Sequence, residues 1–329
     1  MYFDTLAHYD SGAFNADRKE LLASMPQKGV ELIVNPGCDL ESSRTAIALA
    51  EEFPFVYAAV GVHPSDCGAW EDSWLEQLRA LAAHPKVRAI GEIGLDYYWK
   101  DNPPRELQQK VFARQLELAA ELALPVIVHD REAHQDCLEV VRAHPEVRGV
   151  YHCYSGSLED AKVLVKLGWM LSFTGVITYK NARKALEVIE WLPMDRIMVE
   201  TDSPYLTPEP FRGKRNDSRY LPYVIEKMAR WKGVTPEELT DLENYVIKYR
   251  IRGGMWKKPF TKGLQEYGEE ALARLNAIRA KAMLPMLSFE KIFNSKTTAD
   301  FIAALYQYLY QEVQLPERIG ALIASQQAM

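Results

Sequence analysis

Short runs of β-branched or aromatic residues recur along the chain and alternate with amphipathic stretches. The apolar runs lie near residues 2–8, 31–35, 55–62, 87–93, 125–129, 148–153, 169–174 and 196–201. Between them, stretches such as 105–116 and 158–167 place apolar residues three and four positions apart, which is the spacing of a helix with one buried face. Strand followed by helix indicates a parallel sheet, and eight such units predict an α/β fold, the closed (β/α)8 TIM barrel.

The pattern changes near residue 240. Residues 241–329 carry 12 Lys and Arg against 9 Asp and Glu, a net charge of +3, whereas residues 1–240 carry 27 against 36, a net of −9; together they give the −6 of the whole chain. The tail has no histidine or cysteine, and its apolar spacing over 272–283 and 299–313 predicts helices joined by loops. We therefore predict a barrel over residues 1–240 and a helical appendage, possibly a fusion segment, over 241–329.

Charge and cysteine content narrow the class of protein. A mildly acidic chain does not coat nucleic acid through bulk electrostatics, so any phosphate contact must be concentrated in a local basic patch. The chain begins with a strand pattern and not with a secretion signal, and it has no apolar run long enough to span a bilayer, so we expect a soluble, cytoplasmic protein. The four scattered cysteines predict reduced thiols; they are Cys38, Cys67, Cys137 and Cys153.

Imidazole and carboxylate side chains stand at the C-terminal ends of six predicted strands, where barrel enzymes place their active sites. They are His8, His63, Glu92, His129, His152 and Asp202. Such a mixed set suits divalent metal ions, because neutral imidazole binds Zn²⁺ or Mn²⁺ and a carboxylate can bridge two ions. We expect Glu92 to be that bridge, and Asp202 both to bind an ion and to take a proton from water. His84 and His144 instead lie in Ala-His-Pro, where a helix ends, and a structural role is expected for them.

Six sequence motifs lie at the ends of the expected strands. They are Phe3-Asp4-Thr5-x-Ala7-His8, Gly61-Val62-His63-Pro64, Gly91-Glu92-Ile93-Gly94-Leu95-Asp96, Pro125-Val126-Ile127-Val128-His129, His152-Cys153-Tyr154-Ser155-Gly156 and Glu200-Thr201-Asp202-Ser203-Pro204-Tyr205-Leu206. In this order they resemble the TatD family of metal-dependent deoxyribonucleases. The resemblance covers residues 1 to about 240. It implies a barrel that binds two divalent ions (Mg²⁺, Mn²⁺ or Zn²⁺) and hydrolyses DNA, as single strands or from ends, in the manner of an exonuclease.

The same resemblance implies a role for each site residue. His8 would belong to the ligand pair of the first strand, and Glu92 would bridge the two ions and take part in catalysis. His129 and His152 would hold the second ion. Asp202 would complete the first metal site and act in catalysis.

The expected substrate contacts are His63 and the basic residues Arg212, Lys214 and Arg215, which look like the family's loop after the eighth strand. A solvated charge run is an equally good interpretation of any one of the three basic residues. Because the chain as a whole is acidic, phosphate binding requires a local basic patch, and these three residues in one loop form such a patch.

The chain departs from the family pattern at Leu6, which stands where the family has its first ligand histidine. Alternate strand residues share a face, so Leu6 lies beside His8 and offers no donor. Because a lost ligand weakens metal binding strongly, we expect incomplete occupancy and reduced activity.

The second departure begins after residue 241, where the chain weakly resembles a fragment of the B subunit of the AddAB helicase-nuclease. The similar segments are Leu242-Glu243-Asn244-Tyr245-Val246, Tyr249-Arg250-Ile251-Arg252-Gly253 and Trp256-Lys257-Lys258-Pro259-Phe260. They contain neither a nuclease carboxylate set nor cysteines for an iron-sulfur cluster, so this resemblance implies no activity.

Three functions are consistent with these patterns. The first is a metal-dependent deoxyribonuclease, and the second is a related amidohydrolase-like barrel acting on an amide or ester, because the same metal chemistry serves carbonyl and phosphoryl centres. The third is a barrel that has lost its first ion and uses the tail for interaction. The basic loop around Lys214 favours phosphate and therefore the first function.

Overall fold

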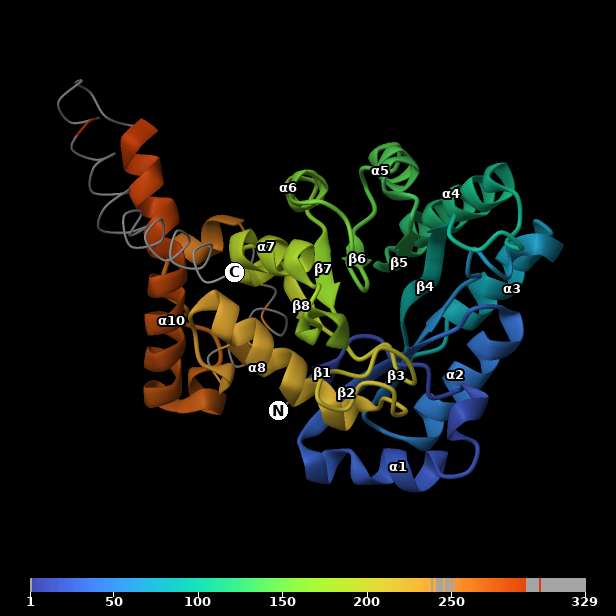
Figure 1. Ribbon diagram of the computed structural model, residues 1–329, viewed down its shortest axis with the longest axis horizontal. Helices are drawn as coiled ribbons and strands as arrows, with labels where there is room; N and C mark the ends of the chain where they lie inside the picture. Colours follow the sequence, from blue (N-terminus) through green and yellow to red (C-terminus); the bar gives the residue numbers. More distant parts are fainter. Residues whose placement is uncertain are drawn as a thin grey trace. The chain divides into compact units, whose positions relative to one another are not determined.

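Eight parallel strands form one sheet in chain order and are joined by helices that lie outside it (Figure 1). This computed structural model describes residues 2–237, 239–240, 245, 249, 251, 253–293 and 302. The strands are β1 (Tyr2–Asp4), β2 (Val30–Pro36), β3 (Val56–Val60), β4 (Val87–Asp96), β5 (Val126–Arg131), β6 (Gly149–Tyr151), β7 (Met170–Phe173) and β8 (Ile197–Val199). The helices between and after them are α1 (Arg18–Ser24), α2 (Leu40–Glu52), α3 (Ser73–Ala82), α4 (Arg105–Leu122), α5 (His134–Arg142), α6 (Leu158–Lys166), α7 (Arg183–Trp191) and α8 (Leu221–Lys232).

Hydrogen bonds between the β8 and β1 segments close the sheet into a barrel. The backbone N–H of Thr5 donates to the carbonyl of Val199 at 3.3 Å, and that of Asp202 donates to the carbonyl of Leu6 at 3.0 Å. Further out, the N–H of His8 donates to the carbonyl of Ser203 at 2.7 Å. The eight predicted strands and the TIM barrel are confirmed, and several strands are shorter than their apolar runs because the chain leaves the ladder near the mouth.

Two apolar layers pack against the strands, one outside the barrel and one inside it. One layer packs strands against helices and includes Ile33, Val128, Leu164 and Met228. The other is a separate cluster to which neighbouring strands or the segments directly after them each contribute one side chain: Leu6, Val34, Ala59, Ala89, Ile127 and Val150. Strand side chains that do not pack against the helices point into the barrel. This cluster therefore fills the barrel interior beneath the mouth.

The chain divides into two compact units, Met1–Glu243 and Asn244–Met329. In the second unit, the amide of Asn276 pairs with the backbone of Phe260, whose ring stacks on that of Tyr245 at 4.7 Å between centroids. The helix predicted over 272–283 falls within α10 (Leu264–Phe293), whose only non-helical residue is Gly268. The helix predicted over 299–313 lies outside the described residues, Ile302 excepted.

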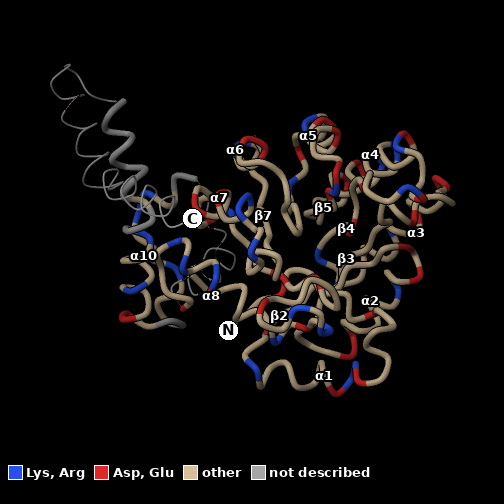
Figure 2. The backbone as a smooth tube through the Cα atoms, viewed as in Figure 1, with Lys and Arg blue, Asp and Glu red and all other residues tan. Residues whose placement is uncertain are grey.

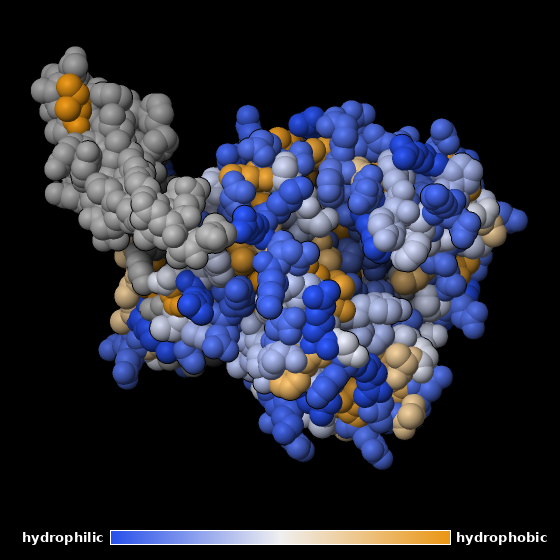
Figure 3. All heavy atoms as spheres, viewed as in Figure 1, coloured by the Kyte–Doolittle hydropathy of each residue, from blue (hydrophilic) through white to orange (hydrophobic). Residues whose placement is uncertain are grey.

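The surface of the barrel unit is polar and carries both signs of charge. Lys and Arg alternate with Asp and Glu over the outer helices (Figure 2), and the face seen in Figure 3 is mostly hydrophilic. Among the described helices, none combines the length and apolar character needed to cross a membrane. With charges mixed in this way, attraction of a polyanion depends on local groups and not on a uniform field.

Candidate metal centre at the mouth of the barrel

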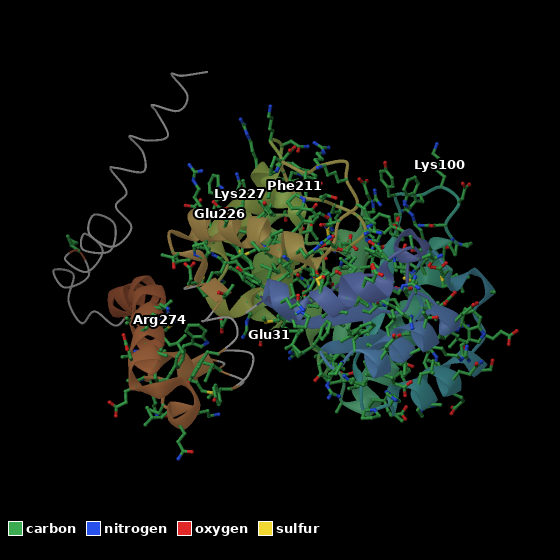
Figure 4. The ribbon with its side chains drawn as sticks, turned by 90° about the horizontal axis from the view of Figure 1, so that it is seen from below. Glu31, Lys100, Phe211, Glu226, Lys227 and Arg274 are labelled. Carbon is green, nitrogen blue, oxygen red and sulfur yellow. The ribbon has the colours of Figure 1, made fainter. Side chains whose placement is uncertain are left out.

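The loops that follow the strands gather at one end of the barrel. In Figure 4, Lys100 from the loop after β4 and Phe211 from the loop after β8 both lie toward the top of the view, whereas Glu31 at the start of β2 lies lower. This end carries the imidazoles and carboxylates that the sequence analysis selected, because parallel strands all finish there.

Glu92 lies at the centre of this group, with its side chain only 3% exposed. Its Oε1 atom is 2.8 Å from both His129 Nδ1 and His152 Nε2, and 3.6 Å from His63 Nε2. Its Oε2 atom is 3.4 Å from His8 Nε2. One buried carboxylate therefore reaches four imidazoles that come from four different strand ends.

Asp202 approaches the same group from the loop after β8, with Oδ1 3.6 Å from His8 Nε2. Its backbone φ of 54° lies in the left-handed region, a conformation that costs a residue with a side chain about 1 kcal/mol or more. The adjacent Thr201 is fixed by the buried carboxylate of Asp4, which accepts hydrogen bonds from its N–H at 2.9 Å and its hydroxyl at 2.6 Å. The fold thus holds Asp202 at the mouth in a strained backbone conformation.

Cys38 is a donor that the sequence analysis placed only among the reduced thiols. Its sulfur, a nitrogen of His8 and an oxygen of Glu92 all lie within 4.8 Å of one another. The backbone N–H of Cys38 donates to Ser42 Oγ at 2.8 Å, and its carbonyl accepts from the N–H of His63 at 2.8 Å, so the backbone that carries the thiol is held in place. Cys38 follows β2 by two residues, and the rule of strand ends that selected the histidines would have selected it too.

Burial and mutual contacts shift the pKa values of this group in opposite directions. Burial alone would raise the pKa of Glu92, but the charge of His152 and hydrogen bonds from the surrounding imidazoles hold it well below its usual range. Burial, with the charge of His129, lowers the pKa of His63 to about 3. Burial raises the pKa of Asp202 to about 6. Glu92 is therefore an ionised carboxylate whose charge is balanced by protonated imidazoles, and a metal cation would take over that role once the imidazoles lose their protons.

Two further carboxylates lie behind the imidazoles, and the sequence analysis gave them no role. Asp96 Oδ2 is 3.2 Å from His129 Nε2, and Glu200 Oε1 is 3.5 Å from His152 Nδ1. Carboxylates in such positions commonly orient metal-binding histidines. Each shares a motif with a predicted ligand, and that proximity in sequence is the signal that could have identified it.

Leu6 lies in the barrel interior, fully buried, and contributes no donor to the group around Glu92. Its side chain packs in the same layer as Val34 and Ile127. The position where the resemblance led us to expect a missing ligand is thus occupied by core packing.

The three basic residues of the loop after β8 have different surroundings. Arg215 Nη2 lies 2.6 Å from Asp17 Oδ2, so this guanidinium ties the loop to the start of α1. The guanidinium of Arg212 lies 4.3 Å from the centre of the Tyr179 ring, and Lys214 Nζ lies 5.4 Å from the centre of the Phe211 ring. Arg215 is held by an ion pair, and a phosphate group would have to displace Asp17 to use it.

The two histidines of the Ala-His-Pro segments have local partners away from Glu92. His84 Nε2 lies 3.1 Å from Glu51 Oε1, and His144 Nδ1 lies 2.8 Å from the carbonyl oxygen of Val140 in the preceding helix. These contacts agree with the structural role expected for both residues.

Comparison with known proteins places this geometry in a family. The profile of the TatD related DNase family matches residues 3–245. A Bacillus subtilis (strain 168) protein named uncharacterized metal-dependent hydrolase YabD is 42% identical over 255 residues, which are 76% of this chain and 100% of that protein. A 3'-5' ssDNA/RNA exonuclease TatD from Cronobacter sakazakii is 36% identical over 243 residues, 71% of this chain and 91% of that protein.

A solved structure agrees with these sequence matches. The crystal structure of YJJV, a TatD homolog from Escherichia coli K12, has a TM-score of 0.70 and 33% identity to this chain, and the match covers 76% of this chain and 98% of that one. The chain therefore belongs to the TatD family and is a metal-dependent hydrolase.

Proposed function

We propose that this hydrolase is a nuclease that cleaves the phosphodiester bonds of single-stranded nucleic acid from an end, using two divalent ions that share Glu92. The observation that carries the proposal is the buried Glu92 carboxylate, which lies within 3.6 Å of four imidazole nitrogens. The name of the Cronobacter relative, a 3'-5' ssDNA/RNA exonuclease, supports the substrate and the direction. Two ions about 3.5–4 Å apart suit phosphodiester hydrolysis, because they can stabilise both the attacking and the leaving oxygen.

The two carboxylate oxygens of Glu92 divide the donors into two groups. Oε2 faces His8, which also approaches Asp202 and Cys38, and these residues would hold the first ion. Oε1 faces the second group, His129 and His152. Cys38 would supply the donor that position 6 lacks.

The donor set bears on the identity of the metal. Imidazole and carboxylate ligands serve Zn²⁺ and Mn²⁺ alike, whereas a thiolate ligand selects the softer metals and is a poor partner for Mg²⁺. With Cys38 beside His8 and Glu92, the first site favours Zn²⁺ over Mg²⁺.

Each of the remaining side chains would have a separate role in the reaction. When bound, the ions would lower the pKa of water and polarise the phosphate. Asp202 would accept the proton of the attacking water, because its carboxylate lies beside His8 at the proposed first ion. His63 would hydrogen-bond the phosphate, and Arg212 and Lys214 would attract the strand. We propose that Arg215 secures their loop through Asp17 and contacts phosphate only indirectly.

We also propose that all of this chemistry belongs to the barrel. Every residue assigned above lies within Met1–Glu243, and the tail over 241–329 supplies no histidine or cysteine.

Metal analysis combined with three substrates tests the proposal. The purified protein should contain close to two ions per chain, more than Leu6 alone led us to expect, because Cys38 would replace the missing donor. The protein should shorten a 5'-labelled single-stranded DNA progressively from its 3' end. It should act far more slowly on the matching duplex and on a simple carboxylic ester. Efficient ester hydrolysis with intact DNA would reject the nuclease assignment in favour of an amidohydrolase-like activity, and a folded protein without metal or activity would reject both.

A further inference from the structure

Two exposed aromatic rings stand beside the metal centre. Tyr98 and Trp99, in the loop after β4, are 48% and 55% exposed, although aromatic side chains of this size are usually buried. Their ring centres are 4.8 Å apart and their planes are nearly perpendicular, at 86°. Both side chains are thus held against each other while much of their surface remains in contact with water.

A cation completes this cluster. The guanidinium of Arg131, at the end of β5, lies 4.0 Å from the centre of the Tyr98 ring and 5.3 Å from that of Trp99. The residue after Trp99 is Lys100, which extends outward at the edge of the molecule (Figure 4). Exposed rings next to positive charge are the combination that binds a single strand, because bases stack on the rings and phosphates pair with the cations.

Asp96 connects this cluster to the metal centre. Its Oδ1 atom accepts a hydrogen bond from the N–H of Tyr98 at 2.9 Å and lies 3.4 Å from the N–H of Trp99. Its Oδ2 atom is the one that lies 3.2 Å from His129 Nε2. The backbone of the aromatic pair is therefore separated from a proposed metal ligand by a single carboxylate, so the loop that carries the rings is anchored at the metal centre.

We propose that Tyr98, Trp99 and Arg131 form a stacking platform for an unpaired nucleobase of the substrate strand. The platform rests on the proposed nuclease function for its substrate, and it gives that function a reason to prefer single strands, since a base within a duplex is already stacked. A protein partner is a poorer occupant, because stable protein interfaces bury about 800 Å² on each side, far more than two side chains offer.

The chain provides a matched control at the opposite end of the barrel. Trp231 is 44% exposed and lies at the end of α8, 6.0 Å from the Lys227 ammonium group. Barrel helices run antiparallel to the strands, so the C-terminal end of α8 lies away from the mouth. Like Trp99, Trp231 is an exposed tryptophan with a cation nearby, but it lies away from the metal centre.

The kinetic test compares Trp99→Ala, Tyr98→Ala and Trp231→Ala with the parent, all in the metal-loaded form. The substrates are a single-stranded oligonucleotide and methyl p-nitrophenyl phosphate, a small diester without a base. For Trp99→Ala and Tyr98→Ala, KM for the oligonucleotide should rise about tenfold with little change in kcat, and the small diester should be hydrolysed as by the parent. Trp231→Ala should match the parent on both substrates.

Two results would overturn the platform. An unchanged KM for the oligonucleotide in both platform variants would show that the rings bind no base. Equal losses on the oligonucleotide and the small diester would show that the rings act only by supporting Asp96 and His129.

A binding measurement separates this inference from the proposed function. A phosphorothioate oligonucleotide that resists hydrolysis should quench the tryptophan fluorescence of the parent and of Trp231→Ala, and should quench that of Trp99→Ala much less. Quenching by the oligonucleotide in a parent that cleaves no nucleic acid would support the platform and reject the nuclease. Cleavage by the parent with the same quenching in Trp99→Ala would support the nuclease and reject the platform.

Discussion

Replacing Glu92 with glutamine removes the charge at the centre of the site while keeping the size and shape of the side chain. In the parent, two imidazole nitrogens, those of His129 and His152, lie 2.8 Å from Oε1, the distance of charge-assisted hydrogen bonds. A bound ion would replace these contacts, and the Glu92 carboxylate would then be the anion that both ions share. Loss of a group that only orients a metal ligand costs about 10–100-fold, so loss of the charge of the shared ligand should lower metal affinity or hydrolysis rate by more than about 100-fold.

The assay for Glu92→Gln combines metal content, the rate on single-stranded DNA and thermal unfolding of the metal-free protein. Glu121→Gln is the matched control, because Glu121 is exposed on α4 and its ion pair with Arg79 is screened by solvent. The control should keep its metal and its rate. A folded Glu92→Gln protein that retains both ions and a rate within tenfold of the parent would refute the bridging role.

Three further predictions concern other parts of the barrel. Leu6→Ala should lower the free energy of unfolding by about 2–5 kcal/mol, because it leaves a cavity in the barrel interior, and a loss below about 1 kcal/mol in denaturant titration would contradict that packing role. Cys38→Ser should weaken Zn²⁺ binding by at least about 10–100-fold and Mn²⁺ binding much less, and equal zinc affinity in dialysis would remove Cys38 from the first site. Burial lowers the pKa of Lys232 from 10.5 to about 8, so below pH 8 the ammonium is charged in both states and the cost of burying it is fully present. As pH rises from 8 toward 10.5 the folded state loses this proton first and the cost falls. The free energy of unfolding of the parent should therefore rise relative to that of Lys232→Met between about pH 7 and about pH 9.5, and a relative fall would reverse the assigned shift.

The sequence by itself determined the barrel and the place of its chemistry. Eight apolar runs separated by amphipathic stretches predict parallel strands with helices between them, and parallel strands finish at one end of a barrel. Residues as far apart as His8 and Asp202 could therefore be predicted to meet, and they do, at 3.6 Å. The sequence also predicted that position 6 lacks a metal ligand, because side-chain alternation places Leu6 on the same strand face as His8.

Only the tertiary structure decided what each side chain contacts. The approach of Cys38 to His8 and Glu92 and the engagement of Arg215 by Asp17, 198 positions earlier in the chain, depend on loop paths and side-chain rotamers that carry no periodic signal. The same holds for Asp96, whose two oxygens join the Tyr98–Trp99 loop to His129. Periodicity specifies which end of a strand a residue occupies, whereas the partner of a side chain depends on which distant segments fold against it.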